Sequence, residues 1–342
     1  MGASGTLTHR FQYVALWSLA VQIALLATSL FLYSALGLSV AWDSALAIVF
    51  VAAGLTLGWA YFAATKSSAT EQRIGNASLA IALLLLLSAI MTPAQYAAAA
   101  LNRPLIDPAL AQADGWLGVD VSEFAMWTRA HPWISGSLNW GYFTLLWQFA
   151  LIVPVLAMVR DDDALAEYIF HFHSCSIVTI VAFALFPAAS AFQYLGFQST
   201  LPEARFVEHF NGVRAGQMTQ LVFGQMEGLV SMPSFHVAGA LMVTWATRRH
   251  LWLFVPLVAV NTVLCAATFL SGAHYLVDTV AAFGLVALSV WAWRRLEAHT
   301  WVWPQPVTTP VQPFRHSTNA PVEAGREHSL ANSAEAKARE RA

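Results

Sequence analysis

Charged residues are scarce in this chain. Only 11% of its 342 residues are Asp, Glu, Lys or Arg, against roughly 25% in a typical soluble domain. Nine of these 36 residues lie after position 299, so the first 299 residues carry 27. This is too little charge to cover the surface of a soluble protein of this size. The scarcity excludes a soluble globular enzyme, a disordered protein and a nucleic-acid binder, which needs a basic patch.

Cysteine is also scarce. The two cysteines, Cys175 and Cys265, both fall inside apolar runs, which argues against a disulfide framework and favours two small buried side chains. Hydrophobic residues, in contrast, make up 58% of the chain, with 14 Trp and 21 Phe. Abundant aromatic residues are typical of chains with many positions at a membrane interface.

Long apolar runs dominate the first 300 residues. Because a helix needs about 20 apolar residues to cross a bilayer, we predict an all-α polytopic membrane protein with about eight transmembrane helices. The first run is too long for the core of a signal peptide and is interpreted as an anchored span. The eight predicted spans are 11–37, 41–64, 76–100, 136–159, 167–191, 234–249, 251–271 and 275–293.

The chain divides into three parts by composition. Residues 1–100 hold the N-terminal transmembrane helices, and residues 101–298 hold the remaining spans and two long polar loops, 101–135 and 192–233. Residues 299–342 are rich in Pro at first and then in Ala, Glu and Arg, without apolar periodicity. This pattern predicts a disordered cytoplasmic tail.

The distribution of Lys and Arg predicts the orientation in the membrane. With the N-terminus in the cytoplasm, eight cationic residues lie inside and four outside, which favours cytoplasmic N- and C-termini and places both long loops outside. Asp107 and Asp114 are then interpreted as polar groups of an outer loop, and Asp161–Asp163 as a solvated inner loop, with a Mg²⁺ site as the less favoured alternative. The inside residues are Arg10, Lys66, Arg73, Arg160, Arg248, Arg249, Arg294 and Arg295; the outside ones are Arg103, Arg129, Arg205 and Arg214.

The sixth span opens with Ser-Met-Pro-Ser-Phe-His, residues 231–236. Pro233 suits the first turn of a helix, and Ser231 is expected to cap it. The free amides near Ser234 and Phe235, with the positive end of the helix dipole, would form an anion site. His236 lies in the same turn and can offer a proton to a bound anion.

A second polar group lies between the seventh and eighth spans. His274 and Asp278 are four residues apart, so they lie on one face of a helix with about 5–6 Å between their Cβ atoms. A carboxylate at this position can accept the imidazole N–H, fix the tautomer and stabilise the charged ring after the other nitrogen attacks an electrophile. Under the predicted orientation, His236 and His274 face the same outer side.

A metal site is the alternative suggested by His171, His173 and Cys175. Side chains at positions i and i+2 of a helix diverge, so these residues are interpreted as packed polar groups. No metal is expected.

The two polar motifs carry a family resemblance. Residues 231–236, followed by Gly-Ala-His-Tyr-Leu-Val-Asp at 272–278, resemble the last two motifs of the type 2 phosphatidic acid phosphatase superfamily. The branch most resembled holds the fungal inositol phosphorylceramide synthases and their bacterial relatives. The likeness covers roughly residues 100–290, most clearly 205–285, and the Arg103–Asp107 stretch is similar to that branch less specifically.

The resemblance implies a role for each motif residue. His274 would be the nucleophile that takes the phosphoryl group, Asp278 would orient it, and His236 would protonate the leaving oxygen and later activate the acceptor. Ser234 and nearby amides would hold phosphate oxygens. Residues 101–298 would form the phosphatase-like catalytic domain, a helical bundle.

Two departures from the family pattern concern the phosphate pocket. Phe235 stands where the family has Gly, and Ala267-Thr268 stand where its third motif has Ser-Arg. Since a phosphoryl-transfer transition state needs fixed positive charge, another cation must supply it. Arg214 is our first prediction for this cation and Arg205 the second.

The predicted reaction is metal-independent and cofactor-free transfer from a membrane phospholipid at the outer leaflet of a plasma (bacterial inner) membrane. With water as acceptor, the protein would be a lipid phosphate or prenyl diphosphate phosphatase. With a lipid hydroxyl such as that of ceramide, it would be a phosphotransferase, and in the resembled branch an inositolphosphotransferase. A transporter or a non-catalytic lipid-binding protein is the alternative from another class.

Overall fold

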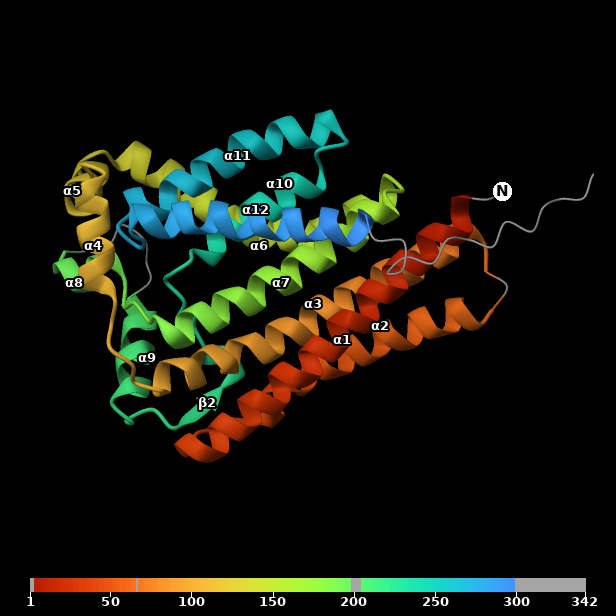
Figure 1. The fold of residues 1–342 in the computed structure, drawn as a ribbon, viewed down its shortest axis with the longest axis horizontal. Helices are drawn as coiled ribbons and strands as arrows, with labels where there is room; N and C mark the ends of the chain where they lie inside the picture. Colours follow the sequence, from red (N-terminus) through yellow and green to blue (C-terminus); the bar gives the residue numbers. More distant parts are fainter. Residues whose placement is uncertain (1–2, 66, 198–203, 299–342) are drawn as a thin grey trace, which may run out of the picture. The chain divides into compact units, whose positions relative to one another are not determined.

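The structure, a computed structural model, describes residues 3–65, 67–197 and 204–298. Within these residues the chain forms twelve α-helices, two 3₁₀ turns and one pair of short parallel strands, so the predicted all-α class is confirmed (Figure 1). The tail predicted to be disordered, residues 299–342, lies outside the described residues.

Seven helices of the described part are long and apolar enough to cross a membrane. Each overlaps one of the eight predicted spans. They begin and end somewhat differently from the prediction because polar caps extend several of them; α3, for example, starts at Ala69 through a capping box of Ser68 and Glu71. The seven are α1 (Ala3–Leu36), α2 (Leu46–Ala64), α3 (Ala69–Ala100), α6 (Pro132–Met158), α7 (Asp162–Leu185), α11 (Leu251–Leu270) and α12 (Leu276–Ala298).

The span predicted at 234–249 is shorter than the others. It forms α10 (Phe235–Ala246), which has 12 residues and a length of about 18 Å at 1.5 Å per residue. That is less than the roughly 30 Å of a hydrocarbon core. The Ser234 side chain caps its start and the chain leaves the helix at Thr247, one residue before Arg248.

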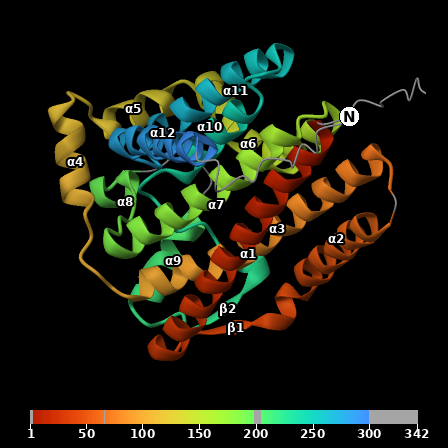
Figure 2. The same cartoon turned by 45° about the vertical axis from the view of Figure 1, so that its right-hand side comes forward.

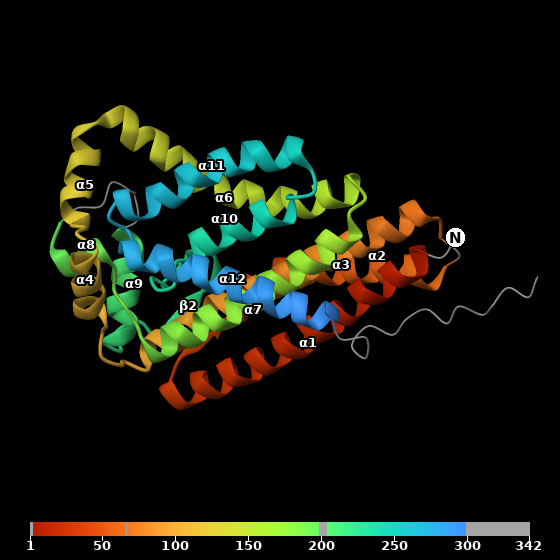
Figure 3. The same ribbon diagram turned by 45° about the horizontal axis from the view of Figure 1, so that its top comes forward.

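The short helix α10 lies in the middle of the bundle. It packs against α6, α7, α11 and α12, while α3 packs against α1, α2 and α7. Figures 2 and 3 show α7 between the group of α1–α3 and the group of α6, α10, α11 and α12. The small residues Ala238 and Ala240 of α10 are completely buried. Because its neighbours surround it, α10 is held without needing to span the membrane itself.

The two long polar loops fold into short elements at one end of the helices. Figure 1 shows α4, α5, α8 and α9 together there, far from the labelled N-terminus. The strand Gln220–Val222 lies in the second of these loops and pairs with Ser39–Ala41, which lies between α1 and α2. The elements are α4 (Asp107–Trp116), α5 (Val121–Ala130), α8 (Ala191–Leu195), α9 (Ala204–Arg214), β1 (Ser39–Ala41) and β2 (Gln220–Val222).

Charged residues meet at the N-terminal end of α7. Asp161 accepts hydrogen bonds from Arg249 and His250 at 3.0 and 3.1 Å. Asp162 lies 3.4 Å from the Arg73 guanidinium, and Asp163 lies 3.6 Å from that of Arg10. The interpretation of Asp161–Asp163 as a merely solvated loop was therefore wrong, because these carboxylates form ion pairs with α1, α3 and the α10–α11 connection.

The polar residues of α7 connect helices. His171 Nδ1 lies 2.7 Å from Ser289 Oγ of α12, and His173 Nε2 lies 2.8 Å from Gln22 Nε2 of α1. Both histidines are buried. Their neighbours make them inter-helical hydrogen-bonding groups, in line with the interpretation of packed polar residues. The cysteines Cys175 and Cys265 are both free thiols.

Candidate active site

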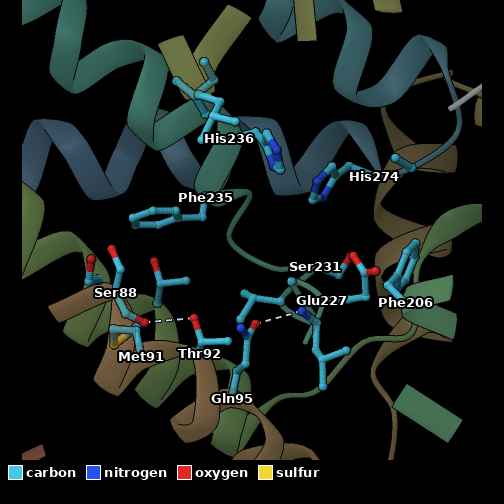
Figure 4. Close-up of a pocket in the computed structure, with 18 of the residues that line it drawn as sticks. Ser88, Met91, Thr92, Gln95, Phe206, Glu227, Ser231, Phe235, His236 and His274 are labelled. Carbon is cyan, nitrogen blue, oxygen red and sulfur yellow. Dashed lines mark hydrogen bonds between the residues drawn. The ribbon is translucent and has the colours of Figure 1, made fainter. Parts of the chain in front are cut away.

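A cavity of about 460 Å³ contains both histidines of the sequence motifs. Its walls come from α3, α6, α7 and α9, the segment 227–231, the start of α10 and the connection before α12. Figure 4 shows His236 and His274 on one side of the cavity, with Phe235 beside them. The structure thus brings the two motifs, 38 residues apart in sequence, to one cavity.

The start of α10 is organised by two serines. Ser234 is the N-cap, and its side chain accepts the Val237 N–H at 3.5 Å. The prediction of Ser231 as the cap was wrong, because its hydroxyl instead donates to Asp278 Oδ2 at 3.2 Å. Pro233 accordingly precedes the cap and does not occupy the first turn. The backbone N–H groups of the first turn, and the positive end of the helix dipole, remain at this cavity wall.

His274 and Asp278 lie on one face at the start of α12, as the spacing predicts. His274 Nδ1 lies 3.4 Å from Asp278 Oδ2, and His274 Nε2 lies 3.3 Å from Ser234 Oγ. The same carboxylate oxygen also accepts the Tyr275 N–H at 3.1 Å. Asp278 is completely buried, while His274 keeps 5% of its surface exposed. The ring therefore turns one nitrogen to the carboxylate and the other towards α10 and the cavity.

His236 lies opposite His274, with their ring centroids 6.5 Å apart. Tyr142 of α6 stacks on the His236 ring with a centroid distance of 4.2 Å, and its hydroxyl lies 3.2 Å from His236 Nδ1. These contacts fix the plane of the imidazole between α6 and the cavity. Sequence reasoning missed Tyr142, because nothing in its local pattern distinguishes it from other aromatic residues of that span.

Two aspartates of the first polar loop hold this region in place. Asp114 accepts the N–H groups of Leu276 and Val277 at 2.8 and 2.9 Å, which satisfies the start of α12. Asp107 accepts the Ala189 N–H and the Tyr275 hydroxyl at 2.9 and 3.1 Å. Both carboxylates are buried, and burial raises the pKa of Asp114. Their interpretation as polar groups of an outer loop is incomplete, because both lie in α4, are buried and bond to segments more than 80 residues away along the chain.

The turn before His274 depends on a glycine. Gly272 has φ +83°, a backbone conformation that L side chains rarely adopt. A Cβ at this position would also overlap the ring of Phe197. The His274 N–H then donates to the Thr268 carbonyl at 3.0 Å. The end of α11, which carries Thr268 where the family pattern has an arginine, therefore supports the backbone of the histidine.

The predicted phosphate-binding arginines both belong to α9. Arg214, at its end, donates to the Arg103 carbonyl at 2.9 Å and stacks over the Phe210 ring; it is not among the residues that line the cavity. The Arg205 side chain lies outside the described residues. Its neighbour Phe206 does line the cavity, so α9 reaches the site near its beginning.

Comparison with known families agrees with this arrangement. A family model described as the PAP2 superfamily matches residues 108–292, more than half of the chain. The chain belongs to the PAP2 superfamily. Neither a search of curated proteins nor one of solved structures found a match. Members of the PAP2 superfamily are phosphatases or phosphotransferases, and membership supports a lipid phosphatase-like activity in the membrane.

The residues that match the PAP2 superfamily begin after α3, but residues of α3 also line the cavity. Ser88, Thr92 and Gln95 of α3 line it opposite the histidines, as Figure 4 shows. They lie outside the matched residues 108–292, and sequence reasoning missed them. The available signal was polar residues within an otherwise apolar run. The domain boundary predicted at residue 100 stays a prediction. Residues from both sides of this boundary line the cavity.

Proposed function

We propose that this PAP2 superfamily protein transfers a phosphoryl or phospho-headgroup from a membrane lipid through a covalent intermediate on His274. The observation that carries the proposal is the placement of this ring. Its Nδ1 faces Asp278 at 3.4 Å, and its Nε2 is turned to the cavity beside Ser234. A neutral imidazole held in this way has a lone pair for attack and a carboxylate to stabilise the cation that results.

In the first half-reaction, His274 Nε2 attacks the phosphorus atom of the lipid and forms a P–N bond. The P–O bond to the leaving alcohol breaks, and that oxygen takes a proton from His236. The two imidazole centroids are 6.5 Å apart, which leaves room for a phosphorus atom and its oxygens between the rings. Asp278 stabilises the positive charge that develops on His274.

In the second half-reaction, His236 removes the proton of an acceptor hydroxyl. The acceptor oxygen attacks the phosphorus atom, the P–N bond breaks, and His274 returns to its neutral form. Proton and charge are thereby restored after one cycle. No step uses a metal or another cofactor.

The phosphate oxygens are assigned to the start of α10 and to α9. The Ser234 hydroxyl and the first amides of α10 supply neutral donors. Fixed positive charge is assigned to the arginines of α9, with Arg214 as the first candidate and Arg205 as the second; the Arg214 guanidinium donates to the Arg103 carbonyl.

The acceptor decides the type of reaction. A lipid hydroxyl, such as that of ceramide, makes the protein a phosphotransferase similar to the inositol phosphorylceramide synthases, and water makes it a lipid phosphatase. We place the reaction at the outer leaflet of a plasma membrane, the bacterial inner membrane, with both termini in the cytoplasm. This placement is supported by the excess of Lys and Arg on the predicted inner side.

The test is turnover by purified protein in mixed micelles. The donors are phosphatidylinositol, phosphatidic acid and a prenyl diphosphate, each with and without ceramide. We expect at least one donor to react, and the His274→Ala and His236→Gln variants to lose at least about a hundredfold in rate. His131→Gln is the matched control, because this exposed imidazole bonds the Trp127 carbonyl and packs on the Trp127 ring, and it does not line the cavity. Equal rates in wild type and His274→Ala, or no reaction with any donor, would contradict the proposal.

A further inference from the structure

The wall of the cavity that faces the histidines carries a stripe of uncharged polar side chains. Ser88, Thr92 and Gln95 follow one another at i, i+4 and i+7 along α3, which places them on one face of the helix. All three line the cavity, and Figure 4 shows them across it from His236 and His274. The stripe lies outside the part of the chain that matches the PAP2 superfamily.

The stripe retains hydrogen-bonding capacity. The Thr92 hydroxyl donates to the Ser88 carbonyl at 2.8 Å, which leaves its oxygen able to accept. Gln95 Oε1 accepts the Leu229 N–H at 2.7 Å. Among the described residues, neither the Gln95 amide nitrogen nor the Ser88 hydroxyl has a hydrogen-bond partner. Polar groups left open within a membrane-spanning helix are unfavourable and mark functional sites.

The chemistry of the stripe differs from that of the catalytic wall. Hydroxyl and carboxamide groups carry no charge, so they recognise hydroxyl or amide groups of a ligand through hydrogen bonds. The cavity is also lined by apolar residues such as Leu87, Leu146 and Phe149, which suit hydrocarbon. Polar and apolar lining together fit a lipid that carries uncharged polar groups next to its chains.

We propose that the α3 stripe is a specificity subsite for the hydroxyl or amide groups of the lipid substrate. The proposal rests on the function proposed above and extends it. The catalytic wall, supplied by the residues matching the superfamily, acts on phosphate, while α3 selects the lipid by its neutral polar groups. Two sources share this chemistry, namely the headgroup of the donor and the polar part of the acceptor.

The experiment measures equilibrium binding to the full-length protein, because binding requires no turnover. The donor pair is phosphatidylglycerol and phosphatidylpropanol, which differ in headgroup hydroxyls. The acceptor pair is ceramide and hexadecanol. We expect wild type to bind phosphatidylglycerol about 10-fold or more tightly than phosphatidylpropanol, or ceramide about 10-fold or more tightly than hexadecanol. The Ser88→Ala/Thr92→Val variant should reduce that ratio by about 3–10-fold, from the net strength of a hydrogen bond.

Three further variants complete the test, one within the stripe and two controls outside the cavity. Gln95→Glu keeps an oxygen for the Leu229 N–H but loses the amide donor, and should also reduce the ratio. Ser78→Ala and Thr28→Val remove hydroxyls that make the same bond to a preceding carbonyl but lie outside the cavity, and should leave it unchanged.

A preference within the donor pair would show that the stripe binds the donor headgroup, and a preference within the acceptor pair would show that it binds the polar part of the acceptor. A preference that is absent from wild type in both pairs, or unchanged in Ser88→Ala/Thr92→Val, would overturn the inference. Turnover of a phospholipid by wild type tests the proposed function separately.

Discussion

At the scale of residues, buried carboxylates position the loop that carries His274. Asp278 accepts from Ser231 and Tyr275 while it faces His274. Asp107 bonds the Tyr275 hydroxyl from the opposite side. The residue that follows the proposed nucleophile is therefore fixed by both its backbone and its side chain.

The bond between Tyr275 and Asp107 gives a prediction. Tyr275→Phe removes one hydrogen bond to a completely buried carboxylate, and should lower the free energy of unfolding by about 1.5–3 kcal/mol, the usual range for a bond to a charged group. Thermal unfolding in detergent measures this change. Tyr61→Phe is the control, since Tyr61 is 65% exposed. An equal midpoint for wild type and Tyr275→Phe would show that the bond contributes nothing.

The site residues were predictable in part, for a physical reason. His274 and Asp278 are four residues apart, so helix geometry alone places them on one face. The roles of Asp107 and Asp114 depend on partners 168 and 162 residues away along the chain, and no local pattern carries that information. Tyr142 escaped notice for the same reason. The α3 stripe did leave a local signal, polar residues within an apolar run, but only the fold shows that they face the cavity.

At the scale of elements, α10 is held by polar contacts as well as by apolar packing. Asn261 of α11 donates to the Ala240 carbonyl and to Thr244 Oγ1, at 3.0 and 2.8 Å. It also accepts from Gln148 Nε2 of α6 at 2.7 Å. One buried side chain of α11 thus connects this helix to α6 and to α10, the element that carries His236.

We expect Asn261→Leu to destabilise the bundle. The substitution removes three inter-helical bonds and leaves Gln148 and Thr244 without this partner, so the loss should be about 1–3 kcal/mol, given the modest strength of such bonds in membranes. Thr262→Val, which removes a bond within α11 only, is the matched control. Thermal stability in detergent compares the two; a midpoint for Asn261→Leu no lower than that of Thr262→Val would refute this role.

The elements themselves followed from hydropathy, because apolar length is what a bilayer requires of a helix. All seven long helices overlap a predicted span. The sixth span, 234–249, is already the shortest of the eight predicted spans, but hydropathy alone does not predict that its helix has 12 residues. Its apolar run continues to Thr247, just before the charged Arg248 and Arg249. Only the Ser234 cap and the surrounding helices show that a helix of 12 residues is long enough at this position.

At the scale of the whole molecule, the cluster of ion pairs and the short elements near the candidate active site lie at opposite ends of the long helices (Figure 1). The ion pairs of Asp161–Asp163 connect α1, α3 and α7 at one end. The short elements α4, α5, α8 and α9 gather at the other end (Figure 1). The predicted orientation assigns the first end to the cytoplasm and the second to the outside.

Cysteine labelling checks this orientation. Gly115→Cys lies on α4, where a Cβ meets no other atom within 4 Å, and Gln72→Cys lies at the exposed start of α3. A membrane-impermeant maleimide should label Gly115→Cys in intact cells and Gln72→Cys only after permeabilisation. The wild-type chain is the blank, with Cys175 buried and Cys265 half-buried. The reverse pattern would invert the orientation and place the site in the cytoplasm.

The central claim is that His274 carries the phosphoryl group, and trapping the intermediate tests it most directly. Purified protein is incubated with a donor lipid labelled at phosphorus, quenched at alkaline pH, where phosphohistidine survives, and digested for mass spectrometry. We predict label on His274 in wild type, more label in His236→Gln if the second half-reaction is slowed more than the first, and none in His274→Ala. Label on another residue, or turnover without label on His274 in either wild type or His236→Gln, would contradict the account.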